Sequence, residues 1–339
     1  MNQFTRREFL QYAAILGLIA TAIALLEGCG FISTPTPVQV RRIGFLSAGF
    51  PPSGPSSFSD AYRQKLRQLG WTEGQNIIFE FRYAEGNNDR LPILAAELVS
   101  IPVDVIVADS TLAALPSKEA TRTIPIVMYS GDALGTGIVT SLAHPGGNVT
   151  GVSGMTAGIS GKRLELLKEA VPGLSRVAIL WDAAGPAPAL AFKETEVAAR
   201  AFGVPLQSLE VRGPTPNFAS AFEAATGEHA NALIVISNRL TERYIKEIVE
   251  LAAKHRLPAM YYNTEWTNAG GLISYGPNDL DLLLYTATFV DKILKGAKPA
   301  DLPVEQPTRF DFIINLKTAK ALGLTLPQSI LAQATEVIQ

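Results

Sequence analysis

An alternation of short and long apolar patterns, beginning at Arg41, constrains the fold more than any other feature of the sequence. Short runs rich in β-branched residues predict strands, and the segments between them carry apolar residues at helical spacing. Strands that alternate with helices in this way are typical of α/β folds with parallel sheets. The first half of the chain is expected to form strands over residues 42–47, 76–83, 103–108 and 124–129, and helices over 61–69, 90–100 and 112–121.

A second series of the same kind follows the glycine-rich stretch 145–151. Its expected strands cover residues 176–181, 204–211, 232–236, 259–262 and 271–275, and its expected helices cover 161–170, 187–202, 217–225 and 242–255. A helix over 279–294, an extended segment over 303–314 and a helix over 316–322 follow. The sequence therefore predicts two similar, doubly wound parallel-sheet lobes in the α/β class.

The first 28 residues differ from the rest of the chain and predict an export signal. Arg6 and Arg7 precede an uncharged, mostly apolar run from Gln11 to Leu26. Because this run is shorter than the ~20 residues that a membrane-spanning helix needs, we expect a cleaved signal instead of a permanent anchor. Residues 5–10 resemble the twin-arginine export motif, although Gln11 stands where a lysine is usual.

Cys29 is the single cysteine of the chain and lies where bacterial lipoproteins keep theirs. Leu26 stands three residues before it and Gly28 one before, whereas Glu27 departs from the small or apolar residue usual at that position. We expect Cys29 to be acylated, so that lipid chains hold the protein on a membrane face without crossing it. Residues 29–40, rich in proline and threonine, are typical of a short extended tether. The expected location is the periplasm or the outer face of the cytoplasmic membrane.

Charge and residue counts exclude several classes of function. With 29 Lys+Arg against 31 Asp+Glu, the chain has no basic excess to neutralise phosphates, so we expect no nucleic-acid partner. One cysteine and three widely separated histidines favour neither a disulfide framework nor a metal site.

Polar side chains follow the predicted strands at the edge where wound sheets bind ligands. Two lobes that face each other would place these residues around a cleft. Hydroxyls, an amide and an aromatic ring orient a small polar ligand, and helix N-termini suit a carboxylate. The candidate ligand-binding residues are Ser47, Ser110, Thr111, Ser130, Asp132, Ser153, Asp182, Asn238 and Tyr262.

Three of these candidates have a second interpretation. Asp132 and Asp182 either bind a ligand amine or cap the segment that follows them through an Asx turn. Tyr262 either stacks on the ligand or packs in the core.

Catalytic and nucleotide-binding motifs are incomplete. Residues 151–155 begin like a hydrolase elbow, but Met155 replaces the final glycine. Arg163 stands where a phosphate loop needs Ser or Thr, and Thr140 stands where a dinucleotide fingerprint needs glycine. We therefore expect neither enzymatic activity nor a cofactor.

Eight segments carry a family resemblance, at residues 69–76 (LGWTEGQN), 84–86 (AEG), 91–99 (LPILAAELV), 131–137 (GDALGTG), 145–151 (PGGNVTG), 161–167 (GKRLELL), 274–277 (SYGP) and 314–320 (INLKTAK). With them the chain resembles, from Arg41 to Ile338, the substrate-binding proteins of ABC transporters, in the exported family that has tryptophan- and tyrosine-binding members. The resemblance implies a type I periplasmic binding protein fold, in which two lobes joined by three hinge crossovers close over a ligand. It places lobe 1 at residues 41–151 plus 277–306, lobe 2 at 152–276 plus 307–339, and hinges at Gly151 and Gly276.

The same resemblance implies a receptor that hands a small molecule to an ABC permease with a cytoplasmic ATPase. An amino-acid-like ligand is favoured, although a nucleoside, a sugar or an aromatic acid would use similar groups. The alternative is a ligand-sensing clamshell that reports to a membrane signalling partner. Ala133 replaces a proline that is common in the family after Gly131 and Asp132, and such departures in the expected pocket leave the ligand open.

Overall fold

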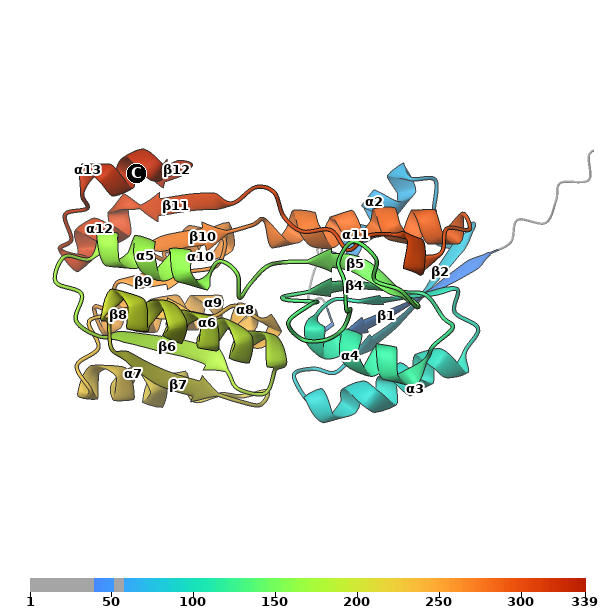
Figure 1. The fold of residues 1–339 in the computed structure, drawn as a ribbon, viewed down its shortest axis with the longest axis horizontal. Helices are drawn as coiled ribbons and strands as arrows, with labels where there is room; N and C mark the ends of the chain where they lie inside the picture. The colour runs from blue at the N-terminus through green and yellow to red at the C-terminus, as the bar shows by residue number, and fades with distance from the viewer. Residues whose placement is uncertain (1–39, 52–57) are drawn as a thin grey trace, which may run out of the picture. The chain divides into compact units, whose positions relative to one another are not determined.

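The computed structural model describes residues 40–51 and 58–339, and Val40–Gln339 forms one compact unit with two β-sheets (Figure 1). The predicted export signal, Cys29 and all of the predicted tether except Val40 lie outside the described residues. Within the described part of the chain, no helix is both long and apolar enough to cross a bilayer.

The first lobe is built on a five-stranded sheet in the order β2-β1-β3-β4-β5, with every neighbouring pair parallel. Its strands and helices are β1 (Arg41–Ser47), α2 (Phe58–Gln68), β2 (Ile77–Tyr83), η1 (Asn88–Arg90), α3 (Leu91–Ser100), β3 (Val105–Ala108), α4 (Thr111–Ala120), β4 (Ile126–Ser130), β5 (Val149–Ser153), α11 (Asp279–Leu294) and η2 (Pro299–Asp301). Successive residues of a strand point to opposite faces. In β3, Ile106 and Ala108 therefore pack toward α3 and α4, whereas Val105 and Val107 pack toward α2 and α11.

The second lobe is built on a seven-stranded sheet in the order β12-β11-β10-β9-β8-β6-β7, parallel except for the β10–β11 pair. Its elements are α5 (Ser160–Ala170), β6 (Val177–Asp182), α6 (Pro186–Phe202), β7 (Leu206–Val211), α7 (Phe218–Gly227), β8 (Ala232–Val235), α8 (Arg239–Arg243), α9 (Ile245–Lys254), β9 (Ala259–Tyr261), α10 (Thr264–Asn268), β10 (Ile273–Gly276), β11 (Asp311–Asn315), α12 (Leu316–Leu322), α13 (Gln328–Gln333) and β12 (Glu336–Ile338). Cores again fill both faces of the sheet. Val177 and Ile179 of β6 belong to one core, and Ala178 and Leu180 belong to the other.

The chain crosses between the lobes three times. It leaves the first lobe after β5, returns between β10 and α11, and leaves again between η2 and β11 (Figure 1). The first and third crossings are paired by backbone hydrogen bonds: Ser153 N donates to Glu305 O at 2.8 Å, and Glu305 N donates to Gly151 O at 2.9 Å. The predicted α/β class with two wound lobes and three crossovers is thus confirmed, while the residue boundaries assigned to the lobes stay predictions.

The segment around Gly151 forms more regular structure than its sequence indicates. Residues 149–153 form strand β5, and Gly151 is paired with Met128 inside the sheet. A Cβ atom on Gly151 would lie 2.1 Å from Met128 O, and one on Gly276 would lie 2.0 Å from Tyr262 O. Each of the two positions therefore requires glycine, because a neighbouring backbone passes too close for a side chain. Their role as hinges remains a prediction.

Short elements that depend on packing in the second lobe were not expected from the sequence. They are α8, α10, α13 and β12, and the predicted extended segment 303–314 forms a strand only at β11.

Candidate functional site

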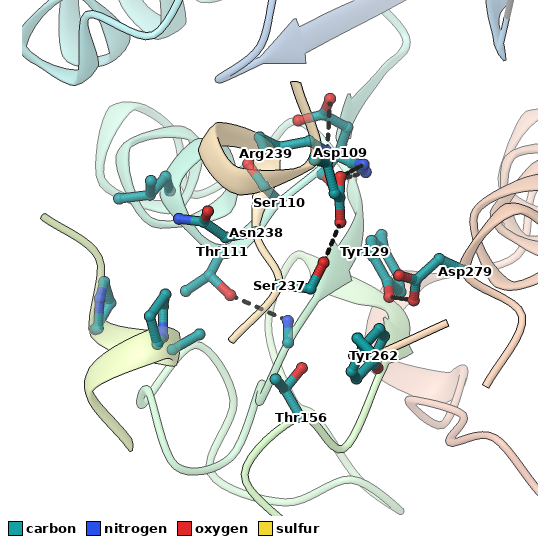
Figure 2. Close-up of a pocket in the computed structure, with 16 residues that line it drawn as sticks. Asp109, Ser110, Thr111, Tyr129, Thr156, Ser237, Asn238, Arg239, Tyr262 and Asp279 are labelled. Carbon is teal, nitrogen blue, oxygen red and sulfur yellow. Dashed lines mark hydrogen bonds and ion pairs between the residues drawn. The ribbon is translucent and has the colours of Figure 1, made fainter. Parts of the chain in front are cut away.

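A cavity lies at the carboxyl ends of strands from both lobes and encloses about 70 Å³ (Figure 2). Tyr129 lies within β4, and the other residues that line the cavity follow β3, β4, β5, β8, β9 and β10 or belong to the start of α6. The lining residues are Asp109, Ser110, Thr111, Leu112, Tyr129, Gly131, Thr156, Pro186, Ala187, Pro188, Ser237, Asn238, Arg239, Glu242, Tyr262 and Asp279. This is the edge at which parallel sheets place their ligands.

The first-lobe wall is formed by the start of α4 and is held from behind by buried hydroxyls. Ser110 is the N-cap of α4 and accepts a hydrogen bond from Ala113 N at 3.3 Å. The hydroxyls of Thr111 and Ser130 share a hydrogen bond of 2.9 Å, and Ser47 Oγ donates to Asp109 Oδ2 at 2.6 Å. Ser47 and Ser130 therefore fix residues that line the cavity without lining it themselves.

The second-lobe wall begins at Asn238, the N-cap of the short helix α8. Its side chain accepts a hydrogen bond from Thr241 N at 3.0 Å and donates from Nδ2 to Asp182 Oδ2 at 2.6 Å. Asp182 is buried and also accepts a hydrogen bond from Ala184 N at 2.9 Å, which is the geometry of an Asx turn. Asn238 thus faces the cavity, and Asp182 orients it from behind.

Arg239 joins the two lobes. Its Nη2 donates to the backbone oxygen of Asp109 in the first lobe at 2.8 Å, and its Nη1 donates to Glu242 Oε2 at 2.8 Å. Burial disfavours the cation, but Glu242 and Asp109 outweigh that effect and raise the pKa of Arg239. The guanidinium is therefore a fixed positive charge whose two carboxylate neighbours balance it.

Two tyrosine rings form the aromatic side of the cavity (Figure 2). Tyr262 donates its hydroxyl hydrogen to Gly154 O at 2.9 Å, and the guanidinium of Arg163 lies 4.4 Å from the centre of its ring. Arg163 is almost fully buried, and burial lowers its pKa to about 10. Tyr129, the other ring, donates its hydroxyl hydrogen to Asp279.

Asp279 is the first residue of α11, directly after the second crossing. Its carboxyl accepts hydrogen bonds from Tyr129 in the first lobe and, at 3.1 Å, from Nδ2 of Asn263 in the second lobe. Burial, and secondly the charge of Glu242, raise the pKa of Asp279 to about 7. A carboxyl that titrates near neutral pH in a cavity is typical of a functional position.

The structure brings four of the predicted site residues to the cavity: Ser110, Thr111, Asn238 and Tyr262. Ser47, Ser130, Ser153 and Asp182 are buried behind its walls. Ser153 Oγ accepts a hydrogen bond from Ala133 N at 3.1 Å. Asp132 lies in the loop after β4, where it caps the turn by accepting from Gly135 N at 2.8 Å. The contact of these residues with a ligand stays a prediction.

Sequence reasoning did not select Tyr129, Arg239, Glu242 or Asp279, all of which line the cavity. Two signals were available. Arg239 and Glu242 form an i,i+3 pair of opposite charge immediately after the selected Asn238, and Asp279 follows the segment 274–277 at a predicted crossover. Within the described residues, no group of three or more His, Cys, Asp or Glu side chains is placed to hold a metal ion.

Comparison with known proteins gives consistent results. Residues 57–338 match the family model described as ABC transporter substrate binding protein. The tyrosine-binding protein of Clostridioides difficile (strain R20291) is 26% identical over 261 residues, which are 76% of this chain and 74% of that protein. Two solved structures are each 27% identical, cover 88% of this chain and all of their own, and have a TM-score of 0.77. They are a conserved domain protein from Vibrio cholerae and an ABC domain from Streptococcus pneumoniae in complex with L-Trp.

Proposed function

Because the chain belongs to the family of ABC transporter substrate-binding proteins, we propose that it captures a small molecule between its two lobes and delivers it to an ABC importer. The partner in this proposal is a permease pair driven by a cytoplasmic ATPase. The mechanism is binding and release, with no chemical step.

The observation that carries the proposal is that one cavity is walled by both lobes. Ser110 and Tyr129 come from the first lobe, and Asn238 and Tyr262 come from the second. A ligand in contact with both walls binds the closed arrangement more tightly than the open one, and this difference in affinity is what drives closure. Closure then gives the permease a surface that distinguishes the loaded receptor from the empty one.

The size of the cavity supports a cycle of opening and closing. About 70 Å³ is far below the roughly 300–1,000 Å³ of ordinary small-molecule sites. A ligand the size of an amino acid therefore enters only when the lobes move apart. The Arg239–Asp109 contact, which joins the lobes across the cavity, must break for that movement.

The lining residues favour an amino-acid-like ligand. The start of α4 at Ser110 and Thr111 offers a helix N-terminus suited to a carboxylate. Tyr129 and Tyr262 offer aromatic faces, and the segment Pro186–Pro188 adds apolar lining. The names of the relatives, a tyrosine-binding protein and a complex with L-Trp, agree with an aromatic amino acid.

The proposed location is outside the cytoplasmic membrane. Residues 1–28 would direct export, and acyl chains on Cys29 would keep the receptor beside its permease. Mass spectrometry of the protein purified from its native membrane tests this point, since a diacylated Cys29 at the N-terminus is heavier than the cleaved chain by the mass of the lipid.

Ligand identification tests the function itself. Unfolding the purified protein releases any co-purified compound for mass spectrometry, and thermal shift with amino acids, nucleosides and sugars then tests each class. A true ligand raises the melting temperature progressively with the logarithm of its concentration. It should also reduce the radius of gyration in small-angle scattering. A compound that binds tightly without any compaction would contradict the clamshell mechanism.

A further inference from the structure

We propose that the cavity takes ligands that carry a protonated amine, and that capture of the amine releases a proton from Asp279 to solvent. This inference rests on the proposed function and specifies the ligand chemistry and the regulation of the same site. In the binding step, the neutral carboxyl of Asp279 loses its proton to buffer as the ammonium group of the ligand takes its place beside the carboxylate.

The first support is the position of Asp279 among the groups that face it. Its two hydrogen-bond donors, Tyr129 and Asn263, are neutral and come from different lobes. Within residues 40–51 and 58–339, Asp279 forms no ion pair. It is thus a cavity-lining carboxyl that lacks a cation in direct contact.

The other charges of the cavity are already committed to one another. Arg239 forms ion pairs with Glu242 at 2.8 Å and with Asp109 at 3.5 Å. Ser237 Oγ also donates to Glu242 at 3.1 Å, and Ser47 Oγ donates to Asp109. With three carboxyl groups and one guanidinium on its walls, the cavity has an excess of negative charge when Asp279 is ionised.

Charged groups farther from the cavity do not remove this excess. Arg163 of α5 lies against the ring of Tyr262 and donates from Nε to the backbone oxygen of Tyr275 at 3.0 Å. Its charge interacts with that of Asp279, but the two groups form no ion pair. Glu265 of α10 and Asp281 of α11 are acidic as well, so neither supplies a countercharge to Asp279. Arg239 and the hydrogen bonds from Tyr129 and Asn263 favour the ionised form of Asp279, but burial, and secondly the charge of Glu242, outweigh them and raise its pKa to about 7.

A ligand amine supplies the missing charge. An ammonium group beside Asp279 would also face the ring of Tyr129 or Tyr262, where an aromatic surface attracts a cation. Because the amine favours the carboxylate over the carboxylic acid, binding and deprotonation are linked. Below pH 7 each unit of pH should weaken binding about tenfold, so affinity at pH 5.5 should be about 30-fold lower than at pH 8.

Three probes separate the amine from the rest of the ligand: L-tyrosine, tyramine, which lacks the carboxylate, and 3-(4-hydroxyphenyl)propionate, which lacks the amine. Titration calorimetry of the purified chain at pH 6 in phosphate and in Bis-Tris, two buffers that take up protons with different enthalpies, gives the number of protons released. We expect about 0.9 proton per bound tyrosine or tyramine and none for the propionate. The affinity of the two amines should rise from pH 5.5 to pH 8 and then level off.

Three variants test whether the proton released on binding comes from Asp279. Asp279→Asn should abolish proton release and remove the pH dependence of amine binding between pH 5.5 and 8. Tyr129→Phe removes a hydrogen bond that stabilises the carboxylate, so the midpoint of the pH profile should move upward. Glu265→Gln, a neighbouring acidic residue outside the cavity lining, is the matched control and should release the same number of protons as the unaltered chain.

The possible results separate the inference about Asp279 from the proposed receptor function. If the amines bind equally at pH 5.5 and pH 8 without proton release, the inference about Asp279 is wrong and the receptor function stands. If proton release persists in Asp279→Asn, the proton comes from another group and the inference is again wrong. If no probe binds at any pH, the amino-acid-like receptor proposal fails and the inference fails with it.

Discussion

Replacing Gly151 by alanine should lower the free energy of unfolding by more than backbone strain alone would. Gly151 has a φ of 135°, a value that is essentially confined to glycine and costs other residues about 1–3 kcal/mol. The new Cβ atom would lie 2.1 Å from Met128 O, so β5 must also shift away from β4. Backbone shifts of this kind cost about 1–3 kcal/mol. Together the two effects predict a loss of about 2–6 kcal/mol.

Gly173→Ala is the matched control for this substitution. Gly173 also has a positive φ, 76°, but a Cβ atom there would meet nothing within 4 Å. Its cost should be limited to about 1–2 kcal/mol of backbone strain. At about 2 °C per kcal/mol for a chain of this size, calorimetry should show a fall in Tm of about 4–12 °C for Gly151→Ala and about 2–4 °C for the control. Equal falls would refute the argument that close packing of β5 on β4 requires the glycine.

Three further results are expected. Arg239→Met removes the hydrogen bond to the backbone oxygen of Asp109 and with it about 1.5–3 kcal/mol of attraction between the lobes. Small-angle scattering should therefore show a larger radius of gyration for the ligand-free variant, and an unchanged radius would show that the contact does not hold the lobes together. A carboxyl whose pKa is raised on folding stabilises the folded protein at low pH, and this contribution is lost as pH rises through the folded pKa. Asp279→Asn lacks the carboxyl, so its stability should increase relative to that of the unaltered chain between pH 5 and pH 8. Thermal unfolding at both pH values checks the sign, and the opposite trend would contradict it. Trp71→Phe removes the 2.8 Å hydrogen bond from Nε1 to the carboxylate of Asp291 and should cost about 1.5–3 kcal/mol in denaturant unfolding. A loss well above about 3 kcal/mol would point to a different cause.

Local patterns were sufficient to predict the wound lobes, because most strands and helices follow from the periodicity of their own residues. They were insufficient for β5, since Val149–Ser153 contains a central glycine and becomes a strand through pairing with β4. The same limit explains α8. Five residues cannot form a stable helix alone, and the Asn238 cap and packing in the lobe determine its position.

The candidate site was predictable in type but not in detail. The rule that ligands bind at the carboxyl ends of parallel strands predicted four residues that line the cavity: Ser110, Thr111, Asn238 and Tyr262. The same rule also predicted Ser130 and Asp182, which are buried behind the cavity. Whether a polar residue at a strand end faces the cavity or a neighbour depends on side-chain direction, which sequence spacing does not give.

Asp279 shows the same limit at long range. It contacts Tyr129, which is 150 residues away in the chain. Only the second crossing of the chain brings the two together, so no local motif in the sequence relates them.

The return of the chain to the first lobe has a consequence for synthesis. Helix α11 supplies Leu283, Ala287, Phe289 and Val290 to a core whose other side is made by β1 and β3. A growing chain that stops before residue 279 therefore has a first sheet with one face incompletely covered, and the whole second series of strands and helices up to β10 must be made before the cover arrives. Such long-range closure slows folding and leaves apolar surface open to aggregation in the interval. The lobe that is synthesised first is thus finished late, and we expect the nascent chain to need protection by chaperones until α11 has been made.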